Sequence, residues 1–374
     1  METRNSFAPS THPASSSPTS SDMSIPIPTI DFAPWFAPTP NPSERLAVAK
    51  SLVSAFRTVG FAQIINHDVP SSLITEAFSI TKQLFDLSPE DKALAPHPPG
   101  PTVHRGYSHP GLEKVYQGFG GDKEMGEKLR EVVDWKFLVS ASINTLYHKE
   151  SYEIGSPHNP DQPNIWLPSS LLPDFQPFML SLYDRLFLTA REILLAIGTG
   201  MELKDPAFLR DFHSGINNQL RLLHYPPVLA KEIEAGEKVR LPAHTDWGSI
   251  TMVWQDGCGG LEVEKPGGDG EFVRVEPREG AVVVNVGDLL MRWTNDTLKS
   301  TLHRVQLPPL ADRYTTTPTG GRITRARYSI PYFVSPDVDK TISCLPESVR
   351  AGETPKYDPV AFGEYAKLRS ALQY

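Results

Sequence analysis

Residues 244–254 read H-T-D-W-G-S-I-T-M-V-W and join two metal-type ligands to a run of strand-forming residues. His244 and Asp246 are two positions apart, so in an extended chain their side chains point to the same face. The run Ile250–Trp254 is β-branched and aromatic, which favours a strand. The stretch therefore predicts a polar site at the end of a β-strand.

Similar short runs, separated by turn-forming residues, follow one another between residues 217 and 335. They are Leu220–Tyr225, Ile250–Trp254, Ala281–Val286, Leu302–Leu307 and Tyr328–Val334. Closely spaced short strands favour a closed or double-sheet β domain of the jelly-roll or cupin type. We expect this domain to be the core, with residues 308–324 as a loop between two of its strands.

Helical patterns dominate the chain before residue 217. Apolar residues recur at helical spacing in 43–56, 71–87 and 173–200, and the last of these is expected to brace a sheet. Short strands are predicted at 25–31 and 60–66.

Four segments follow from these patterns. Residues 1–24 are rich in Ser, Thr and Pro and are expected to be disordered, because they can bury little apolar surface. We expect a helical N-terminal cap region at 25–216 and the catalytic β core at 217–335. The C-terminal segment, 336–374, should carry one helix that packs on the outside.

Composition argues against several other classes of protein. The net charge of −8 argues against an extended nucleic-acid surface. The two cysteines form no C-x-x-C motif, which favours a reducing compartment. No apolar run reaches the ~18 residues of a membrane helix, and no signal-peptide core is present. We expect a monomeric cytoplasmic protein that binds neither membranes nor nucleic acids.

A third candidate ligand is His303, in S-T-L-H-R-V, which must come from another strand. Two imidazoles and one carboxylate are typical of the facial ligand set of non-haem Fe(II), which leaves coordination positions open. Structural zinc sites instead use four closed ligands, often thiolates. The ligand types alone leave Mn, Co and Ni as alternatives.

An anion clamp is predicted downstream of the ligands. Arg327 and Ser329, in R-Y-S-I-P-Y-F, share one strand face. A guanidinium and a hydroxyl suit the carboxylate of a co-substrate. Tyr225, in L-H-Y-P, would add a second hydroxyl.

Together these motifs resemble the 2-oxoglutarate/Fe(II)-dependent dioxygenase superfamily, in its isopenicillin-N-synthase-like branch, over residues 25–374. The motifs I-P-T-I-D at 27–31 and G-F-A-Q-I-I-N-H at 60–67 match the branch's N-terminal cap. The resemblance implies a double-stranded β-helix core that uses Fe(II), 2-oxoglutarate and O2. It implies that a small-molecule substrate is oxidised while 2-oxoglutarate is converted to succinate and CO2. It also implies roles for the residues named above, with iron bound by His244, Asp246 and His303 and the far carboxylate of 2-oxoglutarate by Arg327, Ser329 and Tyr225.

Within this branch the chain is most similar to the fungal thymine 7-hydroxylase type. Matching motifs are E-S-Y-E-I-G at 150–155, L-R-L-L-H-Y-P at 220–226 and G-D-L-L-M-R-W-T-N-D-T-L-K-S-T-L-H-R-V at 287–305. The similarity implies that Arg221, Trp247 and Phe333, with Asn218 as a further candidate, hold a flat substrate such as a pyrimidine base.

The chain also departs from this type. Trp247 stands where the type has Tyr, and residues 117–147 resemble an inserted or altered lid with Trp135 and Phe137 as lining. A fungal natural-product intermediate is therefore the other candidate substrate. Hydroxylation is the expected reaction, with desaturation and ring formation as alternatives.

Two other functions are consistent with the sequence. One is an oxidase of the same branch that uses the non-haem iron without 2-oxoglutarate. The other, from a different class, is a metal-free cupin-like protein that binds a small molecule.

Overall fold

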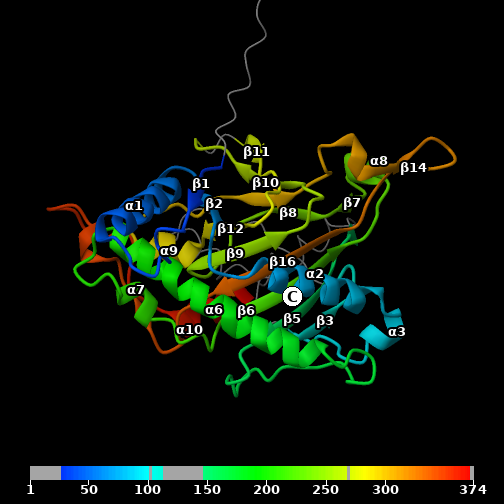
Figure 1. The fold of residues 1–374 in the computed structure, drawn as a ribbon, viewed down its shortest axis with the longest axis horizontal. Helices are drawn as coiled ribbons and strands as arrows, with labels where there is room; N and C mark the ends of the chain where they lie inside the picture. Colours follow the sequence, from blue (N-terminus) through cyan, green and yellow to red (C-terminus); the bar gives the residue numbers. More distant parts are fainter. Residues whose placement is uncertain (1–26, 101–102, 113–145, 268–269, 371–374) are drawn as a thin grey trace, which may run out of the picture.

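The computed structural model describes residues 27–100, 103–112, 146–267 and 270–370 of the chain. Two β-sheets form the core, and helices cover the outside of the larger one (Figure 1). The predicted tail at 1–24 and all but the last two residues of the lid-like segment 117–147 lie outside the described residues.

The larger sheet has eight strands from both halves of the chain. Their spatial order is β1 (Thr29–Asp31), β2 (Phe61–Ile65), β12 (Ala281–Val286), β9 (Ile250–Gln255), β16 (Arg327–Val334), β6 (Gln219–Tyr225), β5 (Glu150–Gly155) and β3 (Gly106–Ser108). Strands β1, β2, β3 and β5 come from the region expected to be a helical cap. The cap and the β core therefore share one sheet.

The smaller sheet faces the larger one. Its order is β11 (Phe272–Arg274), β10 (Leu261–Glu264), β13 (His303–Val305) and β8 (Leu241–His244). Leu261, Val263 and Val305 of this sheet share an apolar cluster with Leu223 and Tyr225 of β6, so the cluster fills the space between the sheets.

Strand β12 shows how the alternation of side chains divides two environments. Val282, Val284 and Val286 belong to the apolar cluster on the helix side of the larger sheet. Val283 belongs to the cluster between the sheets. Asn285 follows Val283 by two residues and is buried on that same inner side. A polar side chain is therefore placed among apolar ones where the two sheets meet.

Three pairs of short strands lie outside these two sheets: β4 (Leu146–Tyr147) with β7 (Lys238–Val239), β14 (Tyr314–Thr316) with β15 (Arg322–Thr324), and β17 (Thr341–Ile342) with β18 (Val360–Ala361). The prediction of a loop at 308–324 was wrong, because β14 and β15 form a hairpin there. Its turn, T-P-T-G-G at 317–321, is closed by the Thr317 hydroxyl, which accepts from the Gly321 amide. The run of Thr, Pro and Gly correctly indicates a turn, but it gives no sign of the short strands on either side of it.

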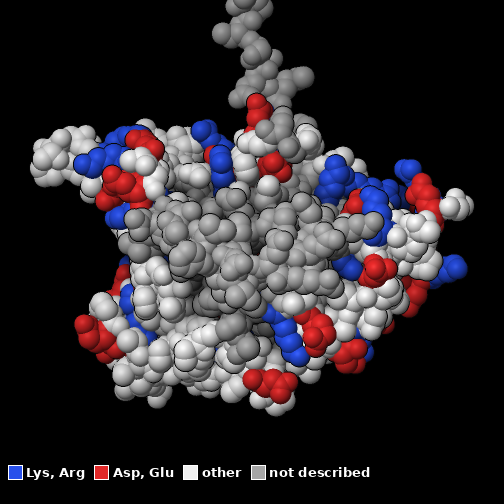
Figure 2. Space-filling model, turned by 180° about the vertical axis from the view of Figure 1, so that it is seen from behind, with Lys and Arg blue, Asp and Glu red and all other residues white. Residues whose placement is uncertain are grey.

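The helices are α1 (Pro42–Thr58), α2 (Ser71–Asp86), α3 (Pro89–Lys92), α6 (Phe175–Gly200), α7 (Phe208–Asp211), α8 (Ala230–Glu234), α9 (Asp288–Trp293) and α10 (Phe362–Ser370), with 3-10 turns at Ala311–Arg313 and Pro346–Ser348. None of the described helices combines the length and apolar character needed to cross a bilayer. On the face in Figure 2, basic and acidic side chains are interspersed around the margin of the described surface.

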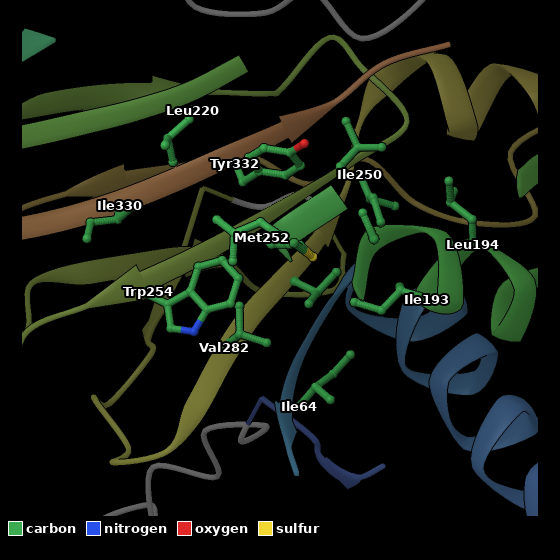
Figure 3. Packing of buried hydrophobic residues seen from close by; sticks show 14 of the residues in the cluster. Ile64, Ile193, Leu194, Leu220, Ile250, Met252, Trp254, Val282, Ile330 and Tyr332 are labelled. Carbon is green, nitrogen blue, oxygen red and sulfur yellow. The ribbon is translucent and has the colours of Figure 1, made fainter. Parts of the chain in front are cut away.

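The long helix α6 braces the larger sheet, as the sequence predicted. Its Ile193 and Leu194 are fully buried and face side chains of the sheet such as Met252 and Val282 (Figure 3). At roughly 1.5–3 kcal/mol for each large side chain removed from water, this contact is a major contribution to the stability of the fold. The sheet is thereby held rigid behind the polar residues on its inner side.

Candidate active site

Three side chains predicted as metal ligands converge at one end of the space between the sheets. Asp246 Oδ1 lies 3.8 Å from His244 Nε2 and 3.7 Å from His303 Nε2. One ligand atom of each residue lies within 4.8 Å of the other two. His303 comes from β13 and stands opposite His244, the last residue of β8. Pairing of these two strands therefore brings together ligands that are far apart in sequence.

Both histidines are oriented by the backbone. His244 Nδ1 lies 3.0 Å from the Pro242 carbonyl oxygen, and His303 Nδ1 lies 3.2 Å from that of Thr301. A carbonyl can only accept, so each Nδ1 carries the proton and each Nε2 keeps its lone pair for a metal.

Asp246 does not lie on the strand, contrary to the same-face argument from its spacing. Strand β8 ends at His244, and Asp246 lies in the turn that follows. The turn is fixed by backbone hydrogen bonds from the Asp288 amide to the Asp246 carbonyl (2.8 Å) and from the Leu289 amide to the Trp247 carbonyl (3.1 Å). Gly287 permits this approach, because a Cβ there would lie 2.2 Å from the Gly248 oxygen.

Two hydrogen bonds fix the carboxylate itself, and neither donor was identified from the sequence. Thr251 Oγ1 and Asn285 Nδ2 both donate to Asp246 Oδ2, at 2.6 and 2.7 Å. The other oxygen, Oδ1, is left facing the two imidazoles. The only sequence signal for Thr251 and Asn285 is that each is a polar residue at an inward position of a strand. That position can be recognised only once the register is known.

The protonation states suit a divalent metal. Burial lowers the pKa of His244, and the neighbouring His303 lowers it further. Burial raises the pKa of Asp246, but the two histidines and the hydrogen bonds from Thr251 and Asn285 outweigh it, so the pKa lies below its ordinary value. Near neutral pH, His244 is therefore neutral and Asp246 ionised, which are the forms that bind metals.

The residues predicted to form an anion clamp also lie together, on the inner side of β16 and β6. Arg327 is 1 % exposed, and its Nη1 donates to Ser329 Oγ at 3.1 Å. Tyr225 pairs with Arg327 across the strands, and the guanidinium carbon lies 4.9 Å from the centre of its ring. Arg327 Nε also donates to the Gly259 carbonyl, and its Nη2 donates to the Gln255 side-chain oxygen.

A pocket lined by both polar and apolar side chains lies beside the turn that holds Asp246. Trp247 and Gly248, from the turn that holds Asp246, contribute to its wall. Of the predicted substrate residues, Asn218, Arg221 and Phe333 line it too. Helix α10 supplies Phe362 and Ala366, so this helix shapes the pocket, although the sequence indicated only packing on the outside. The wall also includes the cationic Arg105 and the amide side chains of Asn159, Gln162, Asn217 and Gln219.

One of the two arginines that line this pocket, Arg221, is paired with a buried carboxylate. Arg221 Nε lies 2.5 Å from Glu153 Oε1, and the Glu153 side chain is fully buried. Arg221 also lies over the ring of Phe333, with the guanidinium carbon 5.5 Å from the ring centre. Asn218 donates to the Tyr332 hydroxyl and accepts from the Ser335 amide, so its side-chain orientation is fixed. The pocket thus offers mainly hydrogen-bonding groups and aromatic surface.

Comparison with known proteins agrees with this geometry. The model of the family "2OG-Fe(II) oxygenase superfamily" matches residues 216–336, and that of "non-haem dioxygenase in morphine synthesis N-terminal" matches residues 27–170. The 2-oxoglutarate-Fe(II) type oxidoreductase ppzD of Metarhizium majus is 35% identical over 96% of this chain and 99% of its own length. The proline hydroxylase buaE of Petromyces alliaceus is 36% identical over 84% of this chain and 90% of its own.

Solved structures show the same relationship. Full-length thymine 7-hydroxylase of Neurospora crassa, in complex with alpha-KG and thymine, aligns with a TM-score of 0.77 and 35% identity, covering 92% of this chain and 96% of that one. The double-stranded β-helix, or jelly-roll, core expected from the sequence is confirmed by these likenesses. The chain belongs to the 2OG-Fe(II) oxygenase superfamily and is an oxidoreductase that uses Fe(II), 2-oxoglutarate and O2 to oxidise a small molecule.

Proposed function

We propose that His244, Asp246 and His303 bind the Fe(II). One observation carries the proposal: their three ligand atoms lie within 4.8 Å of one another, with both Nε2 atoms and Oδ1 facing one point. Three protein ligands leave positions for a chelating co-substrate and for O2. When bound, the iron and 2-oxoglutarate supply oxidation by O2, with decarboxylation of 2-oxoglutarate to succinate.

Arg327, Ser329 and Tyr225 hold the distal carboxylate of 2-oxoglutarate in this proposal. A buried guanidinium and hydroxyl groups form strong charge-assisted hydrogen bonds to a carboxylate, because little water competes for them. The clamp lies on β16 and β6, whose pairing fixes the distance between the three side chains. Its role is to orient the co-substrate toward the metal ligands.

The pocket beside Trp247 binds the substrate, and its lining favours a small planar or cyclic amide. Carboxamides both donate and accept, so they match a ring that alternates N–H and C=O groups. Trp247 and Phe333 offer aromatic faces to such a ring, and Arg221 can donate to a carbonyl. A pyrimidine base has this chemistry, and the related thymine 7-hydroxylase of Neurospora crassa is described in complex with thymine. A fungal natural-product intermediate with a cyclic amide is the other member of this class.

The direct test is succinate release by the iron-loaded enzyme, with thymine and uracil tried first and cyclic amides next. We expect one of them to stimulate release above the rate without substrate. His244→Ala should abolish turnover, and Arg327→Ala should raise the 2-oxoglutarate requirement far more than it lowers the iron content. Oxidation without succinate would support the oxidase alternative and refute the clamp. Hydroxylation as the reaction, a monomeric state, a cytoplasmic location and the lack of nucleic-acid binding stay predictions.

A further inference from the structure

A second buried arginine lies beside the anion clamp. Arg240 immediately precedes β8 and is 0 % exposed. Its Nη2 donates to Thr324 Oγ1 at 2.8 Å and lies 3.4 Å from the Arg325 carbonyl oxygen. Its Nε and Nη1 are buried with no hydrogen-bond partner among the described residues. Arginine is rarely fully buried without a paired anion, so these two atoms need an explanation.

Arg240 and Arg327 are close enough to repel each other. Their guanidinium carbons lie 6.0 and 4.9 Å from the centre of the same Tyr225 ring. Burial lowers the pKa of Arg240, and the charge of Arg327 contributes to that shift, while the neighbouring Cys258 thiol opposes it. A thiol is a weak acceptor and cannot replace a carboxylate.

Neither guanidinium has an acidic partner within the described ranges. No ion pair to Asp or Glu involves Arg240 or Arg327 there. Their partners are neutral amide, hydroxyl and carbonyl oxygens and, for Arg240, the Cys258 thiol. Two uncompensated buried cations cost several kcal/mol each in folding free energy. An anion that binds between them would offset that cost, and 2-oxoglutarate is the anion that the enzyme uses.

We propose that Arg240 is a second guanidinium of the co-substrate site and that its Nε and Nη1 bind the distal carboxylate held by Arg327. The inference rests on the proposed role of Arg327, Ser329 and Tyr225 and adds a residue to it. Its consequence is selectivity: two cations around one carboxylate favour 2-oxo dicarboxylic acids over 2-oxo monocarboxylic acids.

The experiment compares two ligands that differ only in that carboxylate. Binding of 2-oxoglutarate and of 2-oxovalerate, which has a methyl group in its place, is measured calorimetrically on the iron-loaded enzyme without O2. For Arg240→Gln we expect 2-oxoglutarate to bind roughly 10- to 100-fold more weakly, the usual effect of losing a hydrogen bond to a charged group. Binding of 2-oxovalerate should change less than about twofold, because the lost contact is absent from it.

Arg304→Gln is the matched control. Arg304 lies on β13 of the same sheet, pairs with Glu262 at 2.9 Å and covers the Phe272 ring, away from the clamp. The Arg304→Gln variant should leave the affinities for 2-oxoglutarate and 2-oxovalerate unchanged. Should Arg240→Gln fold poorly, Arg240→Lys keeps the charge but loses the planar fork, and it should still reduce the preference for 2-oxoglutarate.

The outcomes separate this inference from the proposed function. If both Arg240 variants weaken the binding of 2-oxoglutarate and 2-oxovalerate equally, or change neither affinity, Arg240 only supports the fold and the inference is wrong. If Arg327→Gln loses the preference for 2-oxoglutarate over 2-oxovalerate while both Arg240 variants keep it, the clamp of Arg327, Ser329 and Tyr225 is supported. Only the role of Arg240 is then refuted. If the unsubstituted enzyme shows no preference, the clamp assignment itself fails.

Discussion

Asn285 Nδ2 donates a hydrogen bond to Asp246 Oδ2 over 2.7 Å, and Thr251 Oγ1 donates to the same oxygen. The three residues come from β12, the turn after β8, and β9. Both donors engage the oxygen that faces away from the imidazoles, so Oδ1 alone is presented to a metal. Two strands of the larger sheet thus orient Asp246, although Asp246 itself follows a strand of the smaller sheet.

Replacing Asn285 by Ala should weaken iron binding about 10- to 100-fold, the typical effect of removing a group that orients a metal ligand. The physical reason is that a loosely held carboxylate must be ordered when the metal binds. The measurement is competition with a calibrated chelator. Gln63→Ala is the control, because this buried amide on the neighbouring β2 donates to the Glu276 carbonyl and does not contact Asp246. Equal iron affinities in both variants would contradict the prediction.

The sequence predicted what depends on local spacing. His244 and Asp246, and likewise Arg327 and Ser329, are two residues apart, and strand alternation or a short turn keeps such pairs together. His303 could be proposed because its type completes a known ligand set. The strands that carry Arg327, Ser329 and His303 followed from their β-branched and aromatic composition. Strand β8, which ends at His244, was not among the predicted strands.

The rest depends on pairing between distant segments. Asn285 acquires its role only because β12 lies beside β9, and nothing in A-V-V-V-N-V specifies that neighbour. Arg240, in E-K-V-R-L-P, has the composition of an exposed segment, and its burial results from packing against the β14–β15 hairpin. Of the strands that the N-terminal region contributes to the larger sheet, β1 and β2 were predicted, whereas β3 and β5 were missed. An edge strand as short as β3 has almost no sequence signal.

The Arg221–Glu153 pair allows structural and binding roles to be separated. Arg221→Gln alone should cost about 3–5 kcal/mol of unfolding free energy, because it removes the ion-pair partner of a fully buried carboxylate. Adding Glu153→Gln should restore most of that loss. Urea denaturation measures both effects.

The double variant Arg221→Gln/Glu153→Gln should nevertheless lose the substrate-stimulated part of succinate release, because the shorter, uncharged Gln side chain does not replace the guanidinium that donates to a substrate carbonyl. Succinate release without substrate should persist. Full stimulation in the double variant would show that Arg221 only neutralises Glu153.

His213 should make the protein less stable in mild acid. Its Nδ1 donates to the Leu209 carbonyl, its Nε2 accepts from Ser249 Oγ, and burial lowers its pKa from 6.5 to about 4. Between these values the unfolded chain binds a proton that the folded chain does not, so stability falls as the pH drops. From pH 7 to pH 5 this amounts to about 2 kcal/mol.

His213→Gln should therefore show a smaller loss of unfolding free energy between pH 7 and pH 5 than the unsubstituted protein, measured on metal-free samples so that metal release does not contribute. His109→Gln, at an exposed histidine, should retain the full pH dependence. A parallel pH dependence in the His213 and His109 variants would show that another group is responsible.

The C-terminal helix should control substrate binding more than iron binding. Arg369 Nη1 of α10 lies 2.7 Å from Asp288 Oδ2, and both side chains are nearly buried. Asp288 also accepts from the Thr245 hydroxyl, between the first two ligands. Arg369→Gln removes the cation from this pair, so we expect α10 to bind less firmly and the pocket wall at Phe362 and Ala366 to open.

For Arg369→Gln the KM for substrate should rise about tenfold or more, and α10 should become more sensitive to limited proteolysis. Lys367→Gln is the matched control, because Lys367 lies on the same helix and its pair with Glu364 is exposed and contributes little. Iron affinity should stay within about twofold in both variants, since Asp246 keeps its hydrogen bonds from Thr251 and Asn285. A loss of iron as large as the loss of substrate affinity would mean that the Arg369–Asp288 pair supports the metal turn itself, and α10 would then be part of the ligand scaffold instead of a wall of the pocket.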